Sequence, residues 1–246
     1  MNETIKIKST SGDFEAYMSY PEKMPGPGIV LIHEVWGLDA HIRNMADRFA
    51  KEGYVVLAPD LLSDTGITKQ INPSILNEIQ DPGTRDEAQK KMRAATAPLQ
   101  VPEFGIKTVA KLKVCVSALR DDAKRVNGKV AVVGFCFGGT YAYALAAADD
   151  RLVAAVPFYG HAPQPFEKLQ TITCPVLAFY GEEDTMLVGQ VQELREKMHE
   201  YGKKFEAVVY AKAGHAFMND TNPTRYRKQA AELAWKKTLE FLGETK

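Results

Sequence analysis

Apolar runs of strand length alternate along the chain with longer stretches of helical periodicity. Two alternating segments, 4–8 and 14–18, flank Ser11-Gly12-Asp13 and predict a β-hairpin. The continuous apolar runs that follow are typical of buried strands and lie at 28–33, 54–58, 130–133, 153–159 and 175–180, with a further strand expected at 205–210. Helices are expected at 39–51, 84–97, 104–120, 140–147, 188–201 and 223–242. This order predicts an α/β fold with a mainly parallel, doubly wound sheet and helices on both faces.

Residues 61–81 interrupt this alternation. Gly66, Pro73 and Pro82-Gly83 act as breakers, so we expect an irregular segment there. A stretch of this length inside a compact domain is often a lid or a pocket wall. We therefore expect a single domain over 1–246, in which about 61–100 forms a lid-like insertion.

The composition narrows the function classes. Acidic and basic residues number 31 each, so nothing indicates binding to nucleic acid or to an anionic membrane. The N-terminus lacks the apolar segment of a secretory signal, and no apolar run is long enough to span a bilayer. We therefore expect a cytoplasmic protein, a monomer or weak homodimer, whose partner is a small-molecule substrate.

The cysteines indicate neither a metal nor a disulfide framework. Cys115, Cys136 and Cys174 are odd in number and scattered, and their spacing matches no metal-ligand pattern. Because the sequence also lacks a nucleotide-binding loop, we expect neither a metal nor another cofactor.

The segment Gly134-Phe135-Cys136-Phe137-Gly138 has the pattern of a nucleophile elbow. It follows a predicted strand and precedes a predicted helix, and the flanking glycines are as small as the tight turn requires. Such a turn exposes the cysteine sulfur over a helix N-terminus, which favours a thiolate. The alternative is a buried structural cysteine, but such a residue needs no glycine on both sides.

An acid and a histidine follow this cysteine in the order that an elbow predicts. Asp184 comes shortly after the strand that ends at 180, and His215 follows the strand that ends at 210. Glu182 and Glu183 are rival carboxylates that the sequence does not exclude. Each residue alone has an ordinary interpretation, a helix cap for the acid and a solvated loop residue for the histidine. Their order with Cys136, each after its own strand, favours a catalytic triad.

The chemistry assigns a role to each member of this triad. The Cys136 thiolate attacks an acyl carbon, His215 transfers protons, and Asp184 holds the histidine tautomer. An oxyanion needs two preorganised donors. We expect the backbone N–H groups of Phe137, at the start of the helix, and of Val35, in the loop after an earlier strand.

Five segments together resemble the dienelactone hydrolases, the cysteine-nucleophile branch of the α/β-hydrolases. These segments are 33–37, 134–139, 158–160, 181–184 and 214–217, and they follow the family's order. The first contains Glu34, a carboxylate at the end of a buried strand, which is costly unless it has a partner or a chemical role. A salt-bridged structural acid is the alternative interpretation of Glu34.

The resemblance implies an α/β-hydrolase fold and hydrolysis of an enol-lactone such as dienelactone through an acyl-enzyme on Cys136. It implies that Glu34 holds or receives the Cys136 proton, so that the thiolate forms only when substrate arrives. It also points to Trp36, Tyr159 and Phe217 as pocket walls, for which plain core packing is the alternative.

The sequence departs from this family in its arginines. The best-known lactonases of the family carry an arginine shortly after the histidine, and it grips the substrate carboxylate. Here no arginine follows His215 until Arg225, and Arg85, beside the lid-like segment, is only a loose match to a second carboxylate-binding arginine. Losing a bidentate arginine–carboxylate contact does not affect the ester or lactone chemistry, but it means that the sequence does not identify the substrate. A general carboxylesterase or thioesterase, and a non-catalytic ligand-binding or redox-sensing homologue, remain as alternatives.

Overall fold

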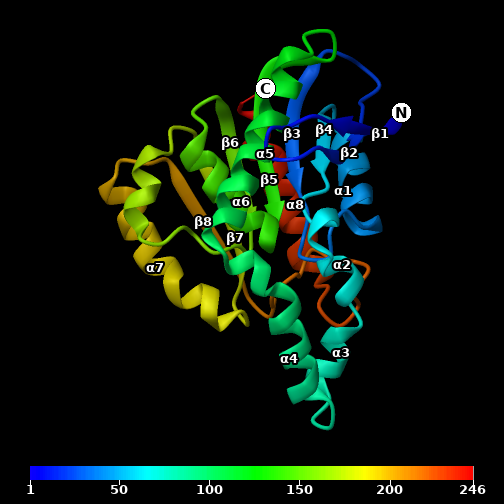
Figure 1. Ribbon diagram of the computed structural model, residues 1–246. Coiled ribbons are helices and arrows are strands. Elements are labelled where there is room, and N and C mark those ends of the chain that lie inside the picture. Colours follow the sequence, from blue (N-terminus) through cyan, green and yellow to red (C-terminus); the bar gives the residue numbers. More distant parts are fainter. Residues whose placement is uncertain (246) are drawn as a thin grey trace.

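An eight-stranded sheet forms the centre of the protein in the computed structural model, which describes residues 1–245 apart from the side chain of Gln80 (Figure 1). The strands are β1 (Asn2–Ile7), β2 (Phe14–Ser19), β3 (Gly26–Ile32), β4 (Val55–Pro59), β5 (Val126–Phe135), β6 (Leu152–Phe158), β7 (Val176–Gly181) and β8 (Phe205–Tyr210). Their order is β1-β2-β4-β3-β5-β6-β7-β8. The β1–β2 hairpin is antiparallel, as predicted, and β2 pairs antiparallel with β4. Every pair from β4 to β8 is parallel, which confirms the predicted α/β architecture.

Helices cover both faces of this sheet, which is why its central strands are continuous apolar runs. The helices that cover it are α1 (Ala40–Lys51), α5 (Pro102–Asp121), α6 (Phe137–Ala148), α7 (Thr185–Glu200) and α8 (Lys228–Gly243). On one face, Phe49 of α1 packs against Trp235 of α8, with ring centroids 4.5 Å apart. Figure 1 shows α5 and α6 on the opposite face. Within residues 1–245 no helix is long and apolar enough to cross a membrane.

The helix ends follow local chemistry. Asp39 caps α1, because its Oδ1 accepts a hydrogen bond from the Ile42 N–H at 3.0 Å. The last helix begins at Lys228 rather than at the predicted 223. The preceding residues form turns instead, in which Arg225 and Tyr226 both donate to the carbonyl of Asn222.

The expectation of an irregular segment at 61–81 is wrong. The chain forms the short helices η1 (Ser63–Thr65), α2 (Ile67–Gln70) and α3 (Ile75–Gln80), followed by α4 (Arg85–Thr96) and η2 (Ala97–Gln100). Gly66 has φ +73° and turns the chain between η1 and α2. Pro73 lies just before α3, where a proline interrupts no helical hydrogen bond. The breakers therefore separate short helices rather than abolish helical structure.

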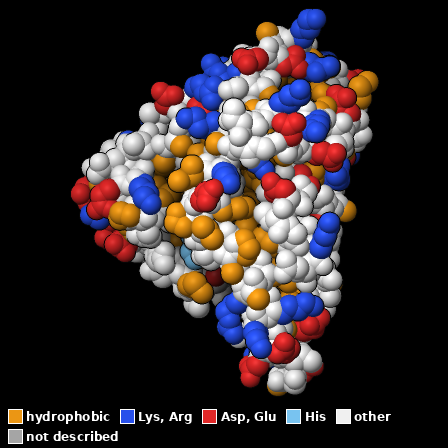
Figure 2. All heavy atoms as spheres, in the orientation of Figure 1, with side chains coloured by type: hydrophobic (Ala, Val, Ile, Leu, Met, Phe, Trp, Pro, Cys, Tyr) orange, Lys and Arg blue, Asp and Glu red, His pale blue; other side chains and the backbone are white. Residues whose placement is uncertain are grey.

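This insertion has a small apolar core of its own. The core contains Leu62, Ile67, Ile71, Ile75, Ala88 and Ala95. Three partly buried rings, Trp36, Phe104 and Phe137, pack against it from the main body of the protein. Figure 1 shows α3 and α4 projecting away from the sheet, and Figure 2 shows apolar side chains gathered between α7 and this projection. The insertion therefore stands over the loops that follow β3 and β5.

Candidate active site

Cys136 occupies the turn between β5 and α6, as the sequence predicts. Its backbone has φ +57° and ψ −113°, a conformation that costs a non-glycine residue about 1–3 kcal/mol. Two hydrogen bonds hold this conformation: the Cys136 N–H donates to the carbonyl of Phe158 at 3.0 Å, and the Thr140 N–H donates to the Cys136 carbonyl at 3.1 Å. The half-buried cysteine is thereby fixed at the start of a helix.

Close backbone contacts explain the two glycines of this turn. A Cβ on Gly134 would collide with the carbonyl of Gly138, and a Cβ on Gly138 would collide with the carbonyl of Ile32 at the end of β3. The start of α6 therefore lies directly against the end of β3. The Gly138 N–H also donates to the carbonyl of His33 at 3.1 Å, which links these two segments.

We expect Gly134→Ala to lower the free energy of unfolding by about 3 kcal/mol, because the backbone carbonyl that a methyl group would meet cannot rotate away. The urea midpoint at unchanged slope measures this loss. Gly189→Ala in α7 is the matched control, since nothing lies within 4 Å of its added methyl group. Replacing a glycine by alanine in a helix interior should raise the free energy of unfolding by up to about 1 kcal/mol. Equal midpoints for the two variants would contradict the crowding described here.

Asp184 is the carboxylate that reaches the histidine. Its Oδ2 lies 2.6 Å from His215 Nδ1, and the two residues follow β7 and β8 respectively. The neighbouring carboxylates have other partners: Glu182 accepts from the Lys212 N–H at 3.2 Å, and Glu183 lies 4.0 Å from Arg227. The ambiguity that the sequence left among three adjacent acids is thus resolved by the direction of the turn after β7.

The surroundings of His215 favour its charged form. Burial alone would lower the pKa of this histidine, but the nearby Cys136 sulfur and the Asp184 hydrogen bond raise it to about 10. Both neighbours therefore act in the same direction, toward an imidazolium beside Cys136. The other two cysteines lie in apolar surroundings, where burial raises the thiol pKa, to about 11 for Cys174 and further for Cys115.

Glu34 is buried at the end of β3, with 2% of its surface exposed. Its Oε2 accepts a hydrogen bond from Asn219 Nδ2 at 2.8 Å. Among the described residues its Oε1 has no hydrogen-bond partner, and no hydrogen bond joins it to Cys136. Burial raises the pKa of this carboxyl. The structure therefore holds Glu34 through the loop that follows His215, rather than through the cysteine.

The loop that carries Glu34 and Val35 is fixed by its buried histidine. His33 Nδ1 lies 2.6 Å from the carbonyl of Glu34, and its Nε2 accepts from the Leu61 N–H at 3.1 Å. These two bonds define the tautomer, with the proton on Nδ1. The His33 ring also stacks on Phe137, with centroids 5.7 Å apart and planes 9° from parallel. The loop after β3 and the start of α6 consequently form one rigid unit.

The three residues predicted to be pocket walls lie in different environments. Trp36 is half-buried against the core of the insertion. Tyr159 is buried, with its ring centroid 5.1 Å from that of His215. Phe217 is fully buried between Tyr159 and Tyr210, at centroid distances of 5.5 and 5.6 Å. Core packing, the alternative stated for it above, therefore describes Phe217.

The two arginines discussed above, Arg85 and Arg225, differ in their position relative to His215. Arg85 is exposed at the start of α4, where its Nε donates to the Ile79 carbonyl at 3.2 Å. That contact ties it to the α3–α4 hairpin rather than to the loop of Cys136. Arg225 lies beside the histidine, with its Nη1 3.5 Å from the His215 carbonyl oxygen.

Three polar residues of this region were not anticipated from the sequence. Asn219 follows His215 by only four residues, so the sequence itself indicates that it lies close to the histidine. His161 comes directly after Tyr159-Gly160, and burial and the charge of His215 lower its pKa. His41 lies in the first turn of α1, and no sequence motif distinguishes it.

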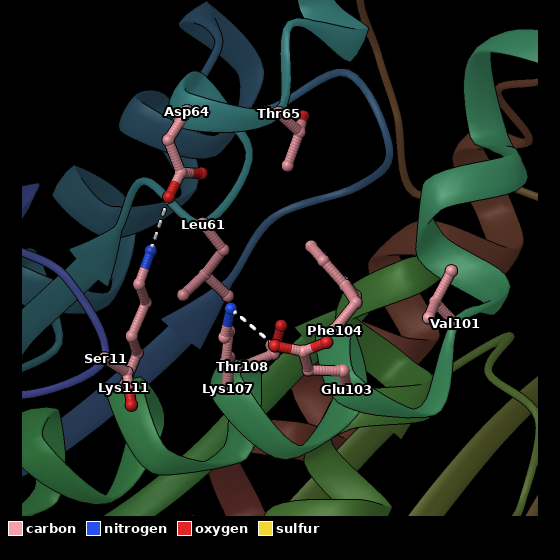
Figure 3. A pocket seen from close by; sticks show the side chains of 10 residues that line it. All are labelled: Ser11, Leu61, Asp64, Thr65, Val101, Glu103, Phe104, Lys107, Thr108 and Lys111. Atoms are coloured by element: carbon pink, nitrogen blue, oxygen red, sulfur yellow. Dashed lines mark hydrogen bonds and ion pairs between the residues drawn. The ribbon is translucent and has the colours of Figure 1, made fainter.

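A pocket of about 320 Å³ lies apart from these residues, between η1 and α5 (Figure 3). It holds two ion pairs: Lys111 Nζ lies 3.0 Å from Asp64 Oδ2, and Lys107 Nζ lies 2.9 Å from Glu103 Oε1. Each lysine of the pocket thus has a carboxylate partner. The Lys111–Asp64 pair joins the base of the insertion to α5 rather than offering a free cation to a substrate.

The parallel sheet, the cysteine turn and the histidine–aspartate pair define an α/β-hydrolase fold. A profile of the dienelactone hydrolase family matches residues 14–246 of this chain. The chain belongs to that family, and it is a hydrolase of this type.

Individual relatives cover nearly the whole chain. A provisionally named carboxymethylenebutenolidase of Saccharolobus solfataricus is 32% identical, with 98% of each protein covered. A crystal structure of a provisionally named dienelactone hydrolase from Klebsiella pneumoniae aligns with a TM-score of 0.76 and 26% identity, covering 98% of this chain and 97% of that one. The dienelactone hydrolase of Anabaena variabilis shares the fold, with a TM-score of 0.69 at 17% identity and coverage of 100% and 98%.

Proposed function

We propose that this protein hydrolyses a small carboxylic ester or lactone through an acyl-enzyme on Cys136. One observation carries the proposal: the 2.6 Å contact of Asp184 with His215 Nδ1 leaves the histidine Nε2 available to the cysteine. The influence of Cys136 on the pKa of His215 indicates that the sulfur and the imidazole lie close together. A cysteine with an oriented imidazole is the arrangement that nucleophilic acyl transfer requires.

The reaction follows from these positions. The Cys136 sulfur adds to the acyl carbon, and the carbonyl oxygen takes up the negative charge. When the intermediate collapses, His215 gives its proton to the departing alkoxide, which leaves as an alcohol or, for a lactone, stays tethered as a hydroxyl group. Water then adds to the thioester as His215 removes its proton. Collapse of this second intermediate releases the carboxylic acid and restores the sulfur.

Two backbone N–H groups suit the oxyanion. The Gly138 N–H bond to the His33 carbonyl places the start of α6 against the loop of Val35. Within the part of the chain that the structure describes, neither the Val35 N–H nor the Phe137 N–H donates a hydrogen bond to another group. Donors that are fixed but unpaired are what a developing oxyanion needs, because no reorganisation is required during reaction. We assign the oxyanion site to these two groups.

The residues around the cysteine favour an uncharged substrate. Trp36 and Phe137 provide apolar surface, and the insertion that packs on them would form the lid of the pocket. Arg85, one of the arginines considered for a substrate carboxylate, belongs to the hairpin. The carboxylate of dienelactone would therefore find no partner in Arg85, and Arg225, which lies beside the histidine, has its Nη1 3.5 Å from the His215 carbonyl oxygen.

We expect kcat/KM for a neutral aryl acetate to exceed that for dienelactone by at least about tenfold, the factor that corresponds to one lost charge-assisted hydrogen bond. A screen of activated aryl esters, aliphatic lactones and dienelactone measures this ratio. Acid quenching followed by mass spectrometry should detect the acyl group on the peptide that contains Cys136. Hydrolysis without any acylated Cys136 peptide, or no hydrolysis of any substrate in the screen, would contradict the proposed function.

A further inference from the structure

Asn219 lies in the turn that follows His215. Ala216, the residue next to the histidine, has φ +64°, a value that a non-glycine residue rarely adopts. The Asn219 N–H donates to the Ala216 carbonyl at 3.0 Å and closes this turn, and the Asn219 carbonyl accepts from the Asn222 N–H at 3.1 Å. Asn219 is also 5% exposed. Its side chain therefore keeps a fixed place relative to His215.

The hydrogen bonds of the Asn219 amide define its orientation. Its Oδ1 accepts two hydrogen bonds from Thr221, one from the N–H at 3.1 Å and one from the hydroxyl at 2.6 Å. Because a backbone N–H can only donate, the amide atom that faces it must be the oxygen. The amide nitrogen consequently faces the other way, where Nδ2 donates to Glu34 Oε2 at 2.8 Å.

This hydrogen bond joins two loops of the candidate active site. Glu34 and Asn219 are 185 residues apart, one in the loop after β3 and the other in the loop after β8. Among the described residues it is the one hydrogen bond between segments 33–37 and 215–222. Both side chains are buried, so water does not compete for the bond, and a hydrogen bond in such surroundings is stronger than an exposed one.

The peptide bond after Glu34 carries the Val35 N–H, one of the two groups assigned above to the oxyanion. The carbonyl and the N–H of a trans peptide lie in one plane and point in opposite directions, so whatever fixes the Glu34 carbonyl also directs the Val35 N–H. Two local hydrogen bonds fix that carbonyl, from His33 Nδ1 at 2.6 Å and from the Gly37 N–H at 3.1 Å. These bonds set the shape of the loop but not its position relative to His215.

We propose that Asn219 is a positioning residue that holds the Val35 N–H in a fixed place relative to His215. It acts through its hydrogen bond to Glu34, and the inference rests on the proposed ester hydrolysis. The start of α6 is already bound to the loop after β3, so the Asn219 bond supplies the link that remains, between that loop and the histidine. The histidine transfers protons in the same intermediate whose oxygen the N–H groups bind, so both must be placed correctly at once.

The first test compares an aryl acetate with the corresponding thionoacetate, in which sulfur replaces the carbonyl oxygen. Sulfur is a weak hydrogen-bond acceptor, so donors placed for an oxyanion favour the oxygen ester. Asn219→Ala should lower kcat for the oxygen ester by about 10- to 100-fold, the loss expected for a misplaced oxyanion donor, with KM within about threefold of the wild type. The thionoester should lose less, so the oxygen-to-sulfur ratio of kcat/KM should fall by about tenfold.

Asn222→Ala is the matched control for this change. Asn222 belongs to the same loop, and its Oδ1 also accepts a hydrogen bond from a nearby hydroxyl, that of Thr224 at 2.7 Å. This contact is exposed and stays within the loop. The variant should therefore keep kcat and the oxygen-to-sulfur ratio within about threefold of the wild type.

A second pair of variants serves if Asn219→Ala does not fold. Thr221→Val removes the hydroxyl that orients the Asn219 amide but keeps the shape of the side chain, and Thr221→Ser supplies the hydroxyl again. The backbone N–H of residue 221 remains in both variants. We expect Thr221→Val to lower the oxygen-to-sulfur ratio by about threefold, the effect of one lost hydrogen bond, and Thr221→Ser to keep the wild-type ratio.

The inference is overturned if Asn219→Ala loses the same factor on both esters, because a purely structural residue would leave the ratio unchanged. If that variant does not fold, equal ratios in Thr221→Val and Thr221→Ser overturn it instead. A wild type that hydrolyses neither ester would remove the proposed function and this inference with it. An active wild type with unchanged ratios in the variants would remove the inference alone, so the two failures are distinguishable.

Discussion

Cys136→Ala is expected to lower kcat for ester hydrolysis by about six orders of magnitude, the loss typical when a nucleophile is removed from an intact triad. The thiolate is the atom that adds to the acyl carbon, and no other described cysteine can replace it. Cys115 and Cys174 are buried, and burial raises the pKa of both thiols. Stopped-flow hydrolysis of an activated aryl ester measures the loss. Turnover near the wild-type rate in this variant would remove Cys136 from the mechanism.

Stability measurements on the same position separate chemistry from folding. Cys136→Gly should be as inactive as Cys136→Ala but more stable by about 1 kcal/mol, because glycine adopts the positive φ of this turn without strain. Alkylation by iodoacetamide at neutral pH, followed by peptide mapping, should modify Cys136 first and the two buried cysteines only after unfolding. Equal reaction of all three thiols in the folded protein would contradict the environment described for Cys136.

Asp184→Asn is expected to lower kcat/KM by about four orders of magnitude, as in other triads whose acid is replaced by its amide. An amide that donates to His215 Nδ1 forces the ring proton onto Nε2, so the histidine cannot accept a proton from water. Loss of the negative charge also lowers the pKa of His215 from about 10. Any remaining activity that needs the imidazolium should therefore disappear at a lower pH than in the wild type.

Glu183→Gln and Glu182→Gln are the matched controls for this change. Both carboxylates precede Asp184 in the same turn, but the structure pairs them with Arg227 and with the Lys212 N–H. Each control should keep kcat/KM within about threefold of the wild type, since removing an exposed ion pair costs at most about 1 kcal/mol. A collapse of activity in Glu183→Gln, with Asp184→Asn active, would transfer the role of the acid to Glu183.

The parts of this protein that the sequence predicts well are those set by local spacing. Alternating apolar runs and helical stretches predict the parallel sheet, because each element carries its own periodicity. The turn at Cys136 is predictable for the same reason, since its glycines lie within two residues of it. The sequence favours Asp184 as the acid but does not exclude Glu182 and Glu183, because the choice depends on how the chain turns after β7.

Contacts between distant segments account for most of what the sequence did not predict. His41 and Asp220 are separated by 179 residues, and no local pattern brings them together. The family resemblance points to Phe217 as a pocket wall, with core packing as the alternative, and its side chain is buried between Tyr159 and Tyr210. In the insertion, breakers that suggested an irregular chain instead separate short helices that a small apolar core stabilises.

Because the insertion has a small apolar core of its own, we expect it to unfold locally as a unit while the rest of the protein stays folded. Groups of residues that share few contacts with the main core open at free energies below that of global unfolding. We therefore expect amide hydrogens of α2 and α4 to exchange with solvent before those of β3 and β5. Each such opening would uncover Trp36, Phe104 and Phe137, the rings on which the insertion rests. Substitutions at Ile67 or Ile71 would then change how often these rings are accessible to solvent while leaving the chemistry at Cys136 unaltered.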